Sequence, residues 1–287
     1  MKQKHILIIT TLFLATLTIC PAETIDAASF FKLPVGAKPI SCGGAYNAVS
    51  GDVNSIYYNP AGLSSVRKTE FTSMVGLLSL DRNLNALAVV FPANFGVIGF
   101  GILNAGVGKI SKYSSDAEKE GEFDYQANCV LISYGKNLLQ QTSFGSNLKI
   151  VFDNLDDYSR YGFAVDLGVI SDIKDNLSIG AKIQNLIGVI GKDYLPLGVV
   201  LGVKYNIIEP LCIVCDANYN LEFEQFKLNF GVQYHVAELL YLACGLYNKE
   251  VSFGIGFNIF KFNIYYAFST DQFNENNLHF LSLGIKF

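Results

Sequence analysis

An alternation of apolar residues with polar or small ones recurs from about residue 71 to the C-terminus, and it constrains the fold of this chain most strongly. Residues 177–184, 199–205, 226–234 and 251–259 show it clearly. In the last segment the two sets are Val251, Phe253, Ile255, Phe257, Ile259 and Ser252, Gly254, Gly256, Asn258. Successive side chains of a β-strand point to opposite faces of a sheet. Each segment is therefore expected to form a strand with one apolar face.

Two kinds of protein are built from such strands. A soluble sandwich buries the apolar faces in a core, whereas a membrane barrel turns them outward to lipid. The segments are about ten residues long, which is the length that a tilted strand needs to cross a bilayer. About fourteen strands are expected, and an even number places both barrel ends on the periplasmic side. The strands should begin near residues 71, 85, 95, 126, 143, 161, 177, 197, 211, 226, 240, 251, 261 and 278.

The predicted connections between these strands alternate in length. The long ones are expected at residues 104–124, 153–160, 186–195 and 270–277, and short ones at 92–94, 172–176 and near Phe260. Long external loops and short periplasmic turns are typical of outer-membrane barrels, and a sandwich does not require this order. The last strand ends on Phe287 and resembles the signal that the barrel assembly machinery recognises. We therefore predict an all-β, transmembrane antiparallel barrel of about fourteen strands over residues 71–287.

The composition agrees with a membrane barrel. The chain is 51% hydrophobic and 16% charged, with a mean hydropathy of +0.31, so it has enough apolar surface to exclude intrinsic disorder. After the N-terminal leader it lacks a run of about 18 apolar residues, which a membrane-spanning helix would need. The strands are therefore expected to cross the bilayer, in contact with lipid of the outer membrane of a diderm bacterium.

Residues 1–27 have the order of charged, apolar and small residues that is typical of a cleavable signal peptide. Lys2 and Lys4 precede the apolar run 6–19, and cleavage is expected near Ala27 or Ala28, with Ala22 as the alternative. The run has about 14 residues, which is too short for a membrane anchor. The residues before Cys20 loosely resemble a lipobox, but Ile19 and Pro21 disfavour lipidation.

Residues 28–70 do not alternate, and small residues are frequent among them. A short helix is expected around residues 45–50 and a turn at Asn59 and Pro60, where the proline restricts both its own backbone and that of the residue before it. The segment is longer than a simple lead-in to the first strand, and the lumen of a fourteen-stranded barrel is wide enough to need filling. We predict that residues 28–70 form a plug inside the barrel.

One run in this segment resembles a known family. Its residues Gly36, Gly43, Gly44, Ala45, Asp52, Asn59, Pro60, Ala61, Gly62 and Leu63 are similar to the N-terminal hatch signature of the FadL superfamily, the OmpP1/FadL/TodX type of outer-membrane proteins. The resemblance is closer to the PorV/PorQ branch and to spirochaete relatives of FadL. It implies a fourteen-stranded barrel with the hatch inside, and a hatch that gates a ligand through Gly43, Gly44, Asp52, Asn59, Pro60, Ala61 and Gly62.

The resemblance also implies two functions. FadL-type proteins pass long-chain fatty acids and other hydrophobic small molecules passively across the outer membrane, through an aperture in the barrel wall. An aperture needs an interrupted strand, and Gly96, Gly99 and Gly101 are candidates because glycine marks bends and bulges. Alternatively, these glycines make room for the plug. The alternative function is that of PorV-like proteins, which bind cargo or other components of a secretion system and transport no lipid.

Other classes of function find little support in the sequence. The formal net charge is −4, without a concentrated basic patch, which disfavours nucleic acid as a partner. Nucleophile-elbow, dinucleotide and phosphate-loop motifs are missing, so we expect neither an enzyme nor a cofactor. Cys212 and Cys215 have a knuckle spacing, but strand geometry separates them and no metal site is expected. Charged side chains expected to face the lumen are Lys149, Asp166, Lys182, Lys204, Asp216, Lys227, Lys261 and Lys286.

Overall fold

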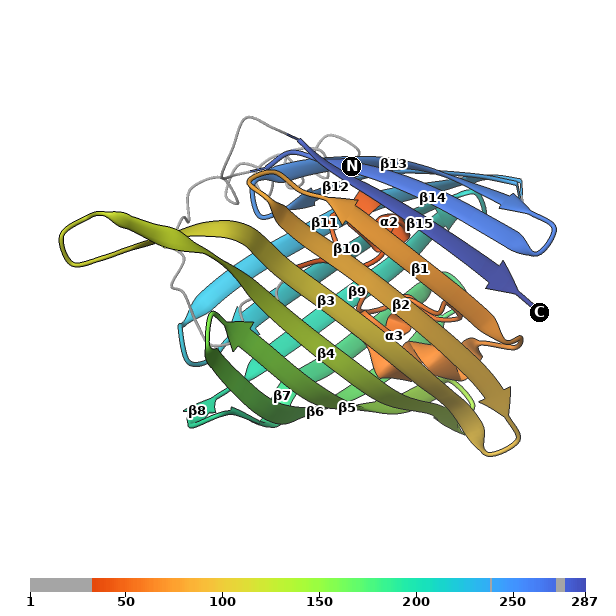
Figure 1. Cartoon of the computed structure of the whole chain (residues 1–287). Coiled ribbons are helices and arrows are strands. Elements are labelled where there is room, and N and C mark those ends of the chain that lie inside the picture. The colour runs from red at the N-terminus through yellow and green to blue at the C-terminus, as the bar shows by residue number, and fades with distance from the viewer. Residues whose placement is uncertain (1–32, 238, 272–276) are drawn as a thin grey trace.

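The computed structural model describes residues 33–237, 239–271 and 277–287, which contain a closed antiparallel β-barrel (Figure 1). Consecutive strands pair with each other, and the ring closes where the first strand pairs with the last. A two-residue strand, β8 (Asp193–Tyr194), pairs with the end of β7. The fourteen strands of the ring are β1 (Glu70–Leu77), β2 (Arg82–Ala93), β3 (Gly96–Tyr113), β4 (Lys119–Leu139), β5 (Thr142–Leu155), β6 (Tyr158–Lys174), β7 (Leu177–Ile190), β9 (Gly198–Ile208), β10 (Leu211–Asn220), β11 (Gln225–Val236), β12 (Leu240–Tyr247), β13 (Glu250–Ile259), β14 (Phe262–Ser269) and β15 (Leu278–Lys286).

The predicted all-β barrel and its fourteen strands are confirmed. Most strands begin within a few residues of the expected positions, and the largest difference is at β4, which begins at Lys119 rather than near residue 126. The signal peptide predicted for residues 1–27 lies outside the described residues and stays a prediction. No helix within the described ranges is long and apolar enough to span a membrane.

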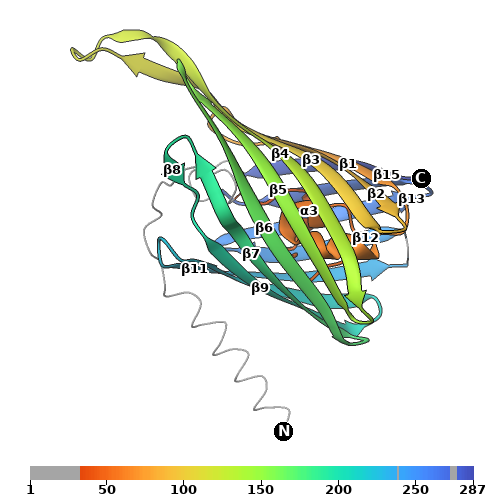
Figure 2. The same ribbon diagram turned by 90° about the horizontal axis from the view of Figure 1, so that it is seen from below.

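Three of the predicted long loops are wrong, because strands continue through most of residues 104–124, 153–160 and 186–195. The largest change is at β3 and β4, which form a ribbon that projects beyond one end of the barrel (Figures 1 and 2). In this ribbon, residues 110–113 of β3 pair only with residues 119–123 of β4. The fourth predicted loop, 270–277, is described only at its ends.

The strands expose their apolar side chains and bury their small or polar ones, which is the reverse of the pattern in a soluble protein. In β13 the apolar side chains of Phe253 and Ile255 are exposed, whereas Ser252 and Gly256 are buried. In β15 the exposed residues Leu281 and Leu283 likewise alternate with buried positions. Large exposed apolar residues occur on every strand of the ring. An apolar band of this kind on the outer surface is suited to lipid, so the strands face a bilayer outward and the lumen inward.

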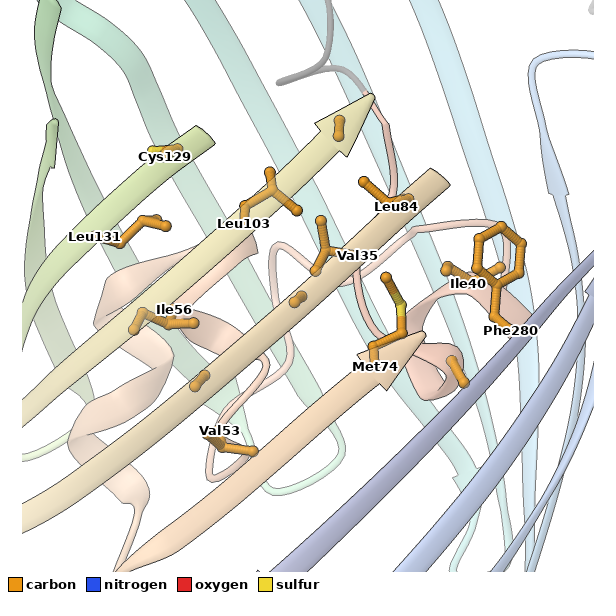
Figure 3. Close-up of a cluster of buried hydrophobic side chains, with 14 of the residues drawn as sticks. Val35, Ile40, Val53, Ile56, Met74, Leu84, Leu103, Cys129, Leu131 and Phe280 are labelled. Atoms are coloured by element: carbon orange, nitrogen blue, oxygen red, sulfur yellow. The ribbon is translucent and has the colours of Figure 1, made fainter. Parts of the chain in front are cut away.

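The inner segment, which we define as residues 33–69, lies inside the ring (Figure 2). It contains the short helices α2 (Ala37–Ser41) and α3 (Ser55–Tyr58) and the 3₁₀ helix η2 (Pro60–Ser65). Helix α2 contacts β12–β15, and η2 contacts β3–β6. Its apolar residues pack with inward-facing residues of the strands into one core, which includes Val35, Ile56, Met74, Leu84, Leu103 and Leu131 (Figure 3).

Candidate functional site

The interior of the barrel is the candidate functional site, and a belt of inward-facing glycines shapes it. At each belt position a Cβ atom would lie against the inner segment, most of them closer than Cβ atoms normally approach other atoms. The strands therefore press directly on the inner segment, most of them on its backbone, because glycine has no side chain to separate them. The belt crosses nine strands of the ring and consists of Gly99, Gly101, Gly135, Gly145, Gly168, Gly180, Gly202, Gly231, Gly245 and Gly254.

Substitution of a belt glycine tests this packing. We expect Gly245→Ala to destabilise the folded barrel by about 1–3 kcal/mol, because the new methyl group overlaps the backbone of Cys42 and Gly43. The matched control is Gly198→Ala, whose methyl group has no neighbour closer than 3.7 Å and should change the stability by less than about 0.5 kcal/mol. The midpoint of urea unfolding, followed by the shift of the folded band on an unboiled gel, measures both. Equal midpoints for the two variants would disprove the close contact.

Buried hydrogen bonds join the inner segment to the strands. One Oδ of Asp216 on β10 accepts hydrogen bonds from the backbone N–H groups of Tyr46 and Asn47, at 2.8 and 2.9 Å. On β5, Asn147 Nδ2 donates to the Ile56 carbonyl at 2.9 Å. The Ala37 N–H donates to Ser282 Oγ at 2.9 Å. Strands from several parts of the ring therefore hold the inner segment by its backbone.

The structure brings most residues of the predicted hatch motif into these contacts. Gly43 and Gly44 both have φ of +67°, which favours glycine, and the Gly43 N–H donates to Ser252 Oγ. Asn59 Oδ1 accepts from the Ala61 N–H and so caps η2. Its Nδ2 donates to the carbonyl of Asn47 within the segment. Pro60, Ala61 and Gly62 are buried, and Pro60 and Ala61 lie against the belt glycine of β5.

Asp52, the one charged residue of the motif, forms an ion pair within the inner segment. Its carboxylate lies 2.7 Å from Lys38 Nζ, and it accepts further hydrogen bonds from Tyr46 and Asn54. Burial would raise the pKa of the Asp52 carboxyl, but Lys38 outweighs burial and holds the pKa well below its usual range. The pair therefore stays charged near neutral pH and cross-links the two halves of the segment.

Of the three candidate glycines for an interrupted strand, Gly99 and Gly101 lie where β3 pairs regularly with both β2 and β4, and Gly96 pairs with Ala93 of β2. Gly99 and Gly101 face Ile56 of the inner segment, and Gly96 lies at the start of the strand with φ of +145°. The register of β3 shifts elsewhere, between Val107 and Ile110. The position of these glycines thus supports the alternative interpretation, in which Gly99 and Gly101 make room for the inner segment.

A second register shift lies in β7, where residues 184–186 oppose Asp166 of β6. Asn185 has φ of +54°, and its N–H donates to Asp166 Oδ1 at 2.9 Å instead of continuing the ladder. Lys149 of β5 stabilises this bulge, because its ammonium lies 2.7 Å from the Asp166 carboxylate and 2.6 Å from Asn185 Oδ1. All three side chains are buried. Lys149, Asp166 and Asn185 therefore form a polar network that holds a β-bulge in the barrel wall at β6–β7.

A cavity of 190 Å³ lies between the inner segment and strands β3–β12. Apolar and aromatic side chains form part of its lining, among them Val35, Tyr57, Leu103, Leu131 and Leu195. The polar part of the lining includes the bulge residues Lys149, Asp166 and Asn185 and also Asn47, Lys182, Asp216 and Asn229. The combination of an apolar wall with a few convergent polar groups is typical of a site for small molecules.

A second hollow lies in the barrel wall at strands β4–β7 and β9. Its lining contains exposed, lipid-facing residues such as Leu167 and Ile183 and also inward positions such as Gly168. Lys182 and Val199 line both this wall hollow and the lumen cavity. The linings of both spaces therefore include residues of β7 and β9 near the bulge.

The other residues named in the sequence analysis have clear positions. Lys149, Asp166, Lys182 and Asp216 are buried on the inward face as predicted, and Lys204, Lys227 and Lys286 are half-buried. Lys261 is a correction, because it lies exposed in the turn between β13 and β14. Cys42 lies in the inner segment against β11 and β12, and the five cysteines of the described ranges are free thiols. Among the described residues, no cluster of His, Cys, Asp and Glu could hold a metal ion.

Comparison with known proteins identifies the fold. No protein-family model matches the sequence, and no similar sequence was found among curated proteins. The toluene transporter TbuX of Ralstonia pickettii is similar in structure, with a TM-score of 0.67 and 13% identity over 88% of this chain and 98% of that one. The toluene transporter TodX of Pseudomonas putida has a TM-score of 0.67 and 12% identity, over 88% of this chain and 98% of that one. A FadL homologue of Pseudomonas aeruginosa has a TM-score of 0.56 and 10% identity, over 85% of this chain and 95% of that one.

At these identities the likeness shows the fold. This chain has the barrel fold of FadL- and TodX-type transporters, which supports the FadL resemblance of its sequence. The comparisons do not support the PorV/PorQ branch, and several solved structures with this fold are described as toluene transporters or monoaromatic hydrocarbon channels.

Proposed function

We propose that this chain is an outer-membrane channel for the passive uptake of small hydrophobic molecules. The observation that carries the proposal is that Lys182 and Val199, near the β7 bulge, line both the lumen cavity and the wall hollow. The inner segment fills the centre of the ring, so we propose that it acts as a plug against water and ions. A hydrophobic molecule would enter the cavity from the open end of the barrel and leave through the wall into the membrane.

The direction of this path follows from solubility. An apolar molecule crosses the polar outer leaflet slowly but partitions readily into hydrocarbon, so an exit into lipid needs no energy source. The neighbours with this fold are described as toluene and monoaromatic hydrocarbon channels, which supports the same class of substrate here. We propose that Gly43, Gly44, Asp52, Asn59, Pro60, Ala61 and Gly62 shape the gate, because contacts of Gly43, Pro60 and Ala61 hold the plug against the strands, while Asp52 and Asn59 fix its conformation from within.

Substitution of Val199 tests the proposed path. We expect Val199→Trp to remove most of the uptake of toluene by intact cells, because Val199 lines both hollows and an indole ring there would block the proposed path between them. Val203→Trp is the matched control, since Val203 is exposed on the same face of β9 and lines neither hollow. The initial rate of uptake of labelled toluene, at equal amounts of folded protein, measures the effect. Equal rates in the two variants would reject a path past Val199.

A further inference from the structure

Several polar groups in the lining of the lumen cavity lack hydrogen-bond partners. Within the described residues, no donor reaches Oδ1 of Asn47, Asp216 or Asn229, although these side chains are at most 5% exposed. Asp216 and Asn229 are directly paired across β10 and β11, and the other Asp216 oxygen holds the N–H group of Asn47. The three oxygens therefore belong to one part of the cavity wall.

Lys182 adds a donor to this group of acceptors. Its side chain is 7% exposed and lines the cavity, and its ammonium makes no hydrogen bond or ion pair to the described part of the chain. At longer range Lys182 interacts electrostatically with Asp166 and Lys149 and, more weakly, with Asp216. The other buried charges of the wall, Lys149 and Asp166, are already paired at 2.7 Å. Lys227 also lines the cavity and has an interaction of its own.

Unsatisfied buried polar groups are uncommon in native proteins, and each costs about 1–3 kcal/mol. A bound group that both donates and accepts hydrogen bonds would remove this cost. A hydrocarbon can do neither, and a carboxylate would bring a negative charge next to Asp216 while offering no donor. A hydroxyl group can donate to one of the oxygens and accept from the Lys182 ammonium. The chemistry of this wall therefore matches a neutral hydroxyl group.

Resting on the proposed uptake function, we infer that the cavity selects hydrophobic molecules that carry a hydroxyl group. The apolar part of such a molecule would contact Leu103, Leu131 and Tyr57, and its hydroxyl group would lie at the wall formed by Lys182, Asp216 and Asn229. The volume of 190 Å³ suits one aromatic ring with small substituents, since an engineered cavity of about 150 Å³ is enough to bind benzene.

Three probes built on the same methylated ring separate the possible ligand classes. Toluene, p-cresol and p-toluate share a methylated ring and differ in carrying no polar group, a hydroxyl or a carboxylate. Titration calorimetry on the purified detergent-solubilised barrel, with heats in detergent alone subtracted, measures their affinities. We expect p-cresol to bind at least about tenfold more tightly than toluene, because one additional satisfied buried group is sufficient for this ratio. We expect p-toluate to bind more weakly than p-cresol.

Two variants test the named wall residues. Asn229→Leu and Lys182→Met remove polar groups that form no hydrogen bond to the described protein, so neither should lower the unfolding midpoint. Both should reduce p-cresol affinity to that of toluene while leaving toluene binding nearly unchanged. The matched control is Asn83→Leu, because Asn83 Oδ1 also lacks a donor but Asn83 does not line the cavity. This control should retain the preference for p-cresol.

The binding measurements test the selection of hydroxyl-bearing molecules, and they do so independently of the proposed uptake function. Equal binding of toluene and p-cresol, tighter binding of p-toluate, or no binding of any probe would overturn the inference. A p-cresol preference that survives in both wall variants would overturn the assignment to Asn229 and Lys182. Uptake rates test the proposed function. If cells took up toluene through the barrel but p-cresol bound no more tightly than toluene, the selection would be rejected and the proposed channel function would be retained.

Discussion

Replacing Ile255 with arginine is expected to destabilise the barrel by about 2–4 kcal/mol. Ile255 lies halfway along β13 with an exposed side chain, and arginine at the centre of a bilayer has this cost on the lipid face of a barrel. Ile259→Arg is the matched control, because Ile259 is exposed on the same face at the end of the strand, where the cost falls to about 0–1 kcal/mol.

Urea titration of the barrel folded into lipid vesicles measures both free energies of unfolding. The two costs differ because the arginines lie at different depths in the bilayer. Both variants place the same charge on the same face of the same strand. If both arginine variants were as stable as the unchanged chain, the exposed apolar band would not face hydrocarbon. A soluble barrel with an apolar surface would then be the better description.

Removing residues 36–66 is expected to turn a closed barrel into an ion-conducting pore. The glycine belt presses on this segment from nine strands, so its removal leaves the centre of a fourteen-stranded ring empty. Barrels of eight strands are filled by their own side chains, whereas those with 16–18 strands leave an aqueous channel. A planar lipid bilayer measures the effect as the current per inserted molecule, and the full-length chain should conduct little.

A shortened β3–β4 ribbon provides the control for this deletion. Replacing residues 114–118 with a two-residue turn removes chain at the tip of the ribbon, outside the lumen, and should leave the conductance low. A heat-modifiable band on a gel establishes that each shortened chain is folded. If the folded chain without residues 36–66 conducted no more than the control, the inner segment would not be the barrier to ions.

The sequence predicts the barrel because lipid imposes a simple periodicity on it. Outward positions must be apolar, so alternation marks each strand wherever it crosses the bilayer, as in residues 251–259. The same reasoning fails outside the bilayer. Residues 108–124 of the ribbon are mostly polar on both faces because water surrounds them, so they resemble a loop in sequence. The β3–β4 ribbon is therefore visible only in the structure.

The site could be predicted in part. Small residues and the Asn59–Pro60 turn mark the inner segment, and an inward-facing glycine can be recognised once the face of its strand is known. The bulge of β7 has no such signal, because it depends on buried side chains of neighbouring strands, Lys149 and Asp166, that hold Asn185 out of register. The unsatisfied oxygens depend in the same way on how the segment packs against β10 and β11.

The initial rate of toluene uptake by intact cells tests the central claim most directly. Cells that lack the gene are compared with cells that carry it, with and without an uncoupler that collapses the energised state of the inner membrane. Passive uptake through this barrel predicts a slow rate without the gene and a faster rate with it, and the uncoupler should change neither. Equal rates with and without the gene, at matched amounts of folded barrel in the complemented cells, would contradict the account.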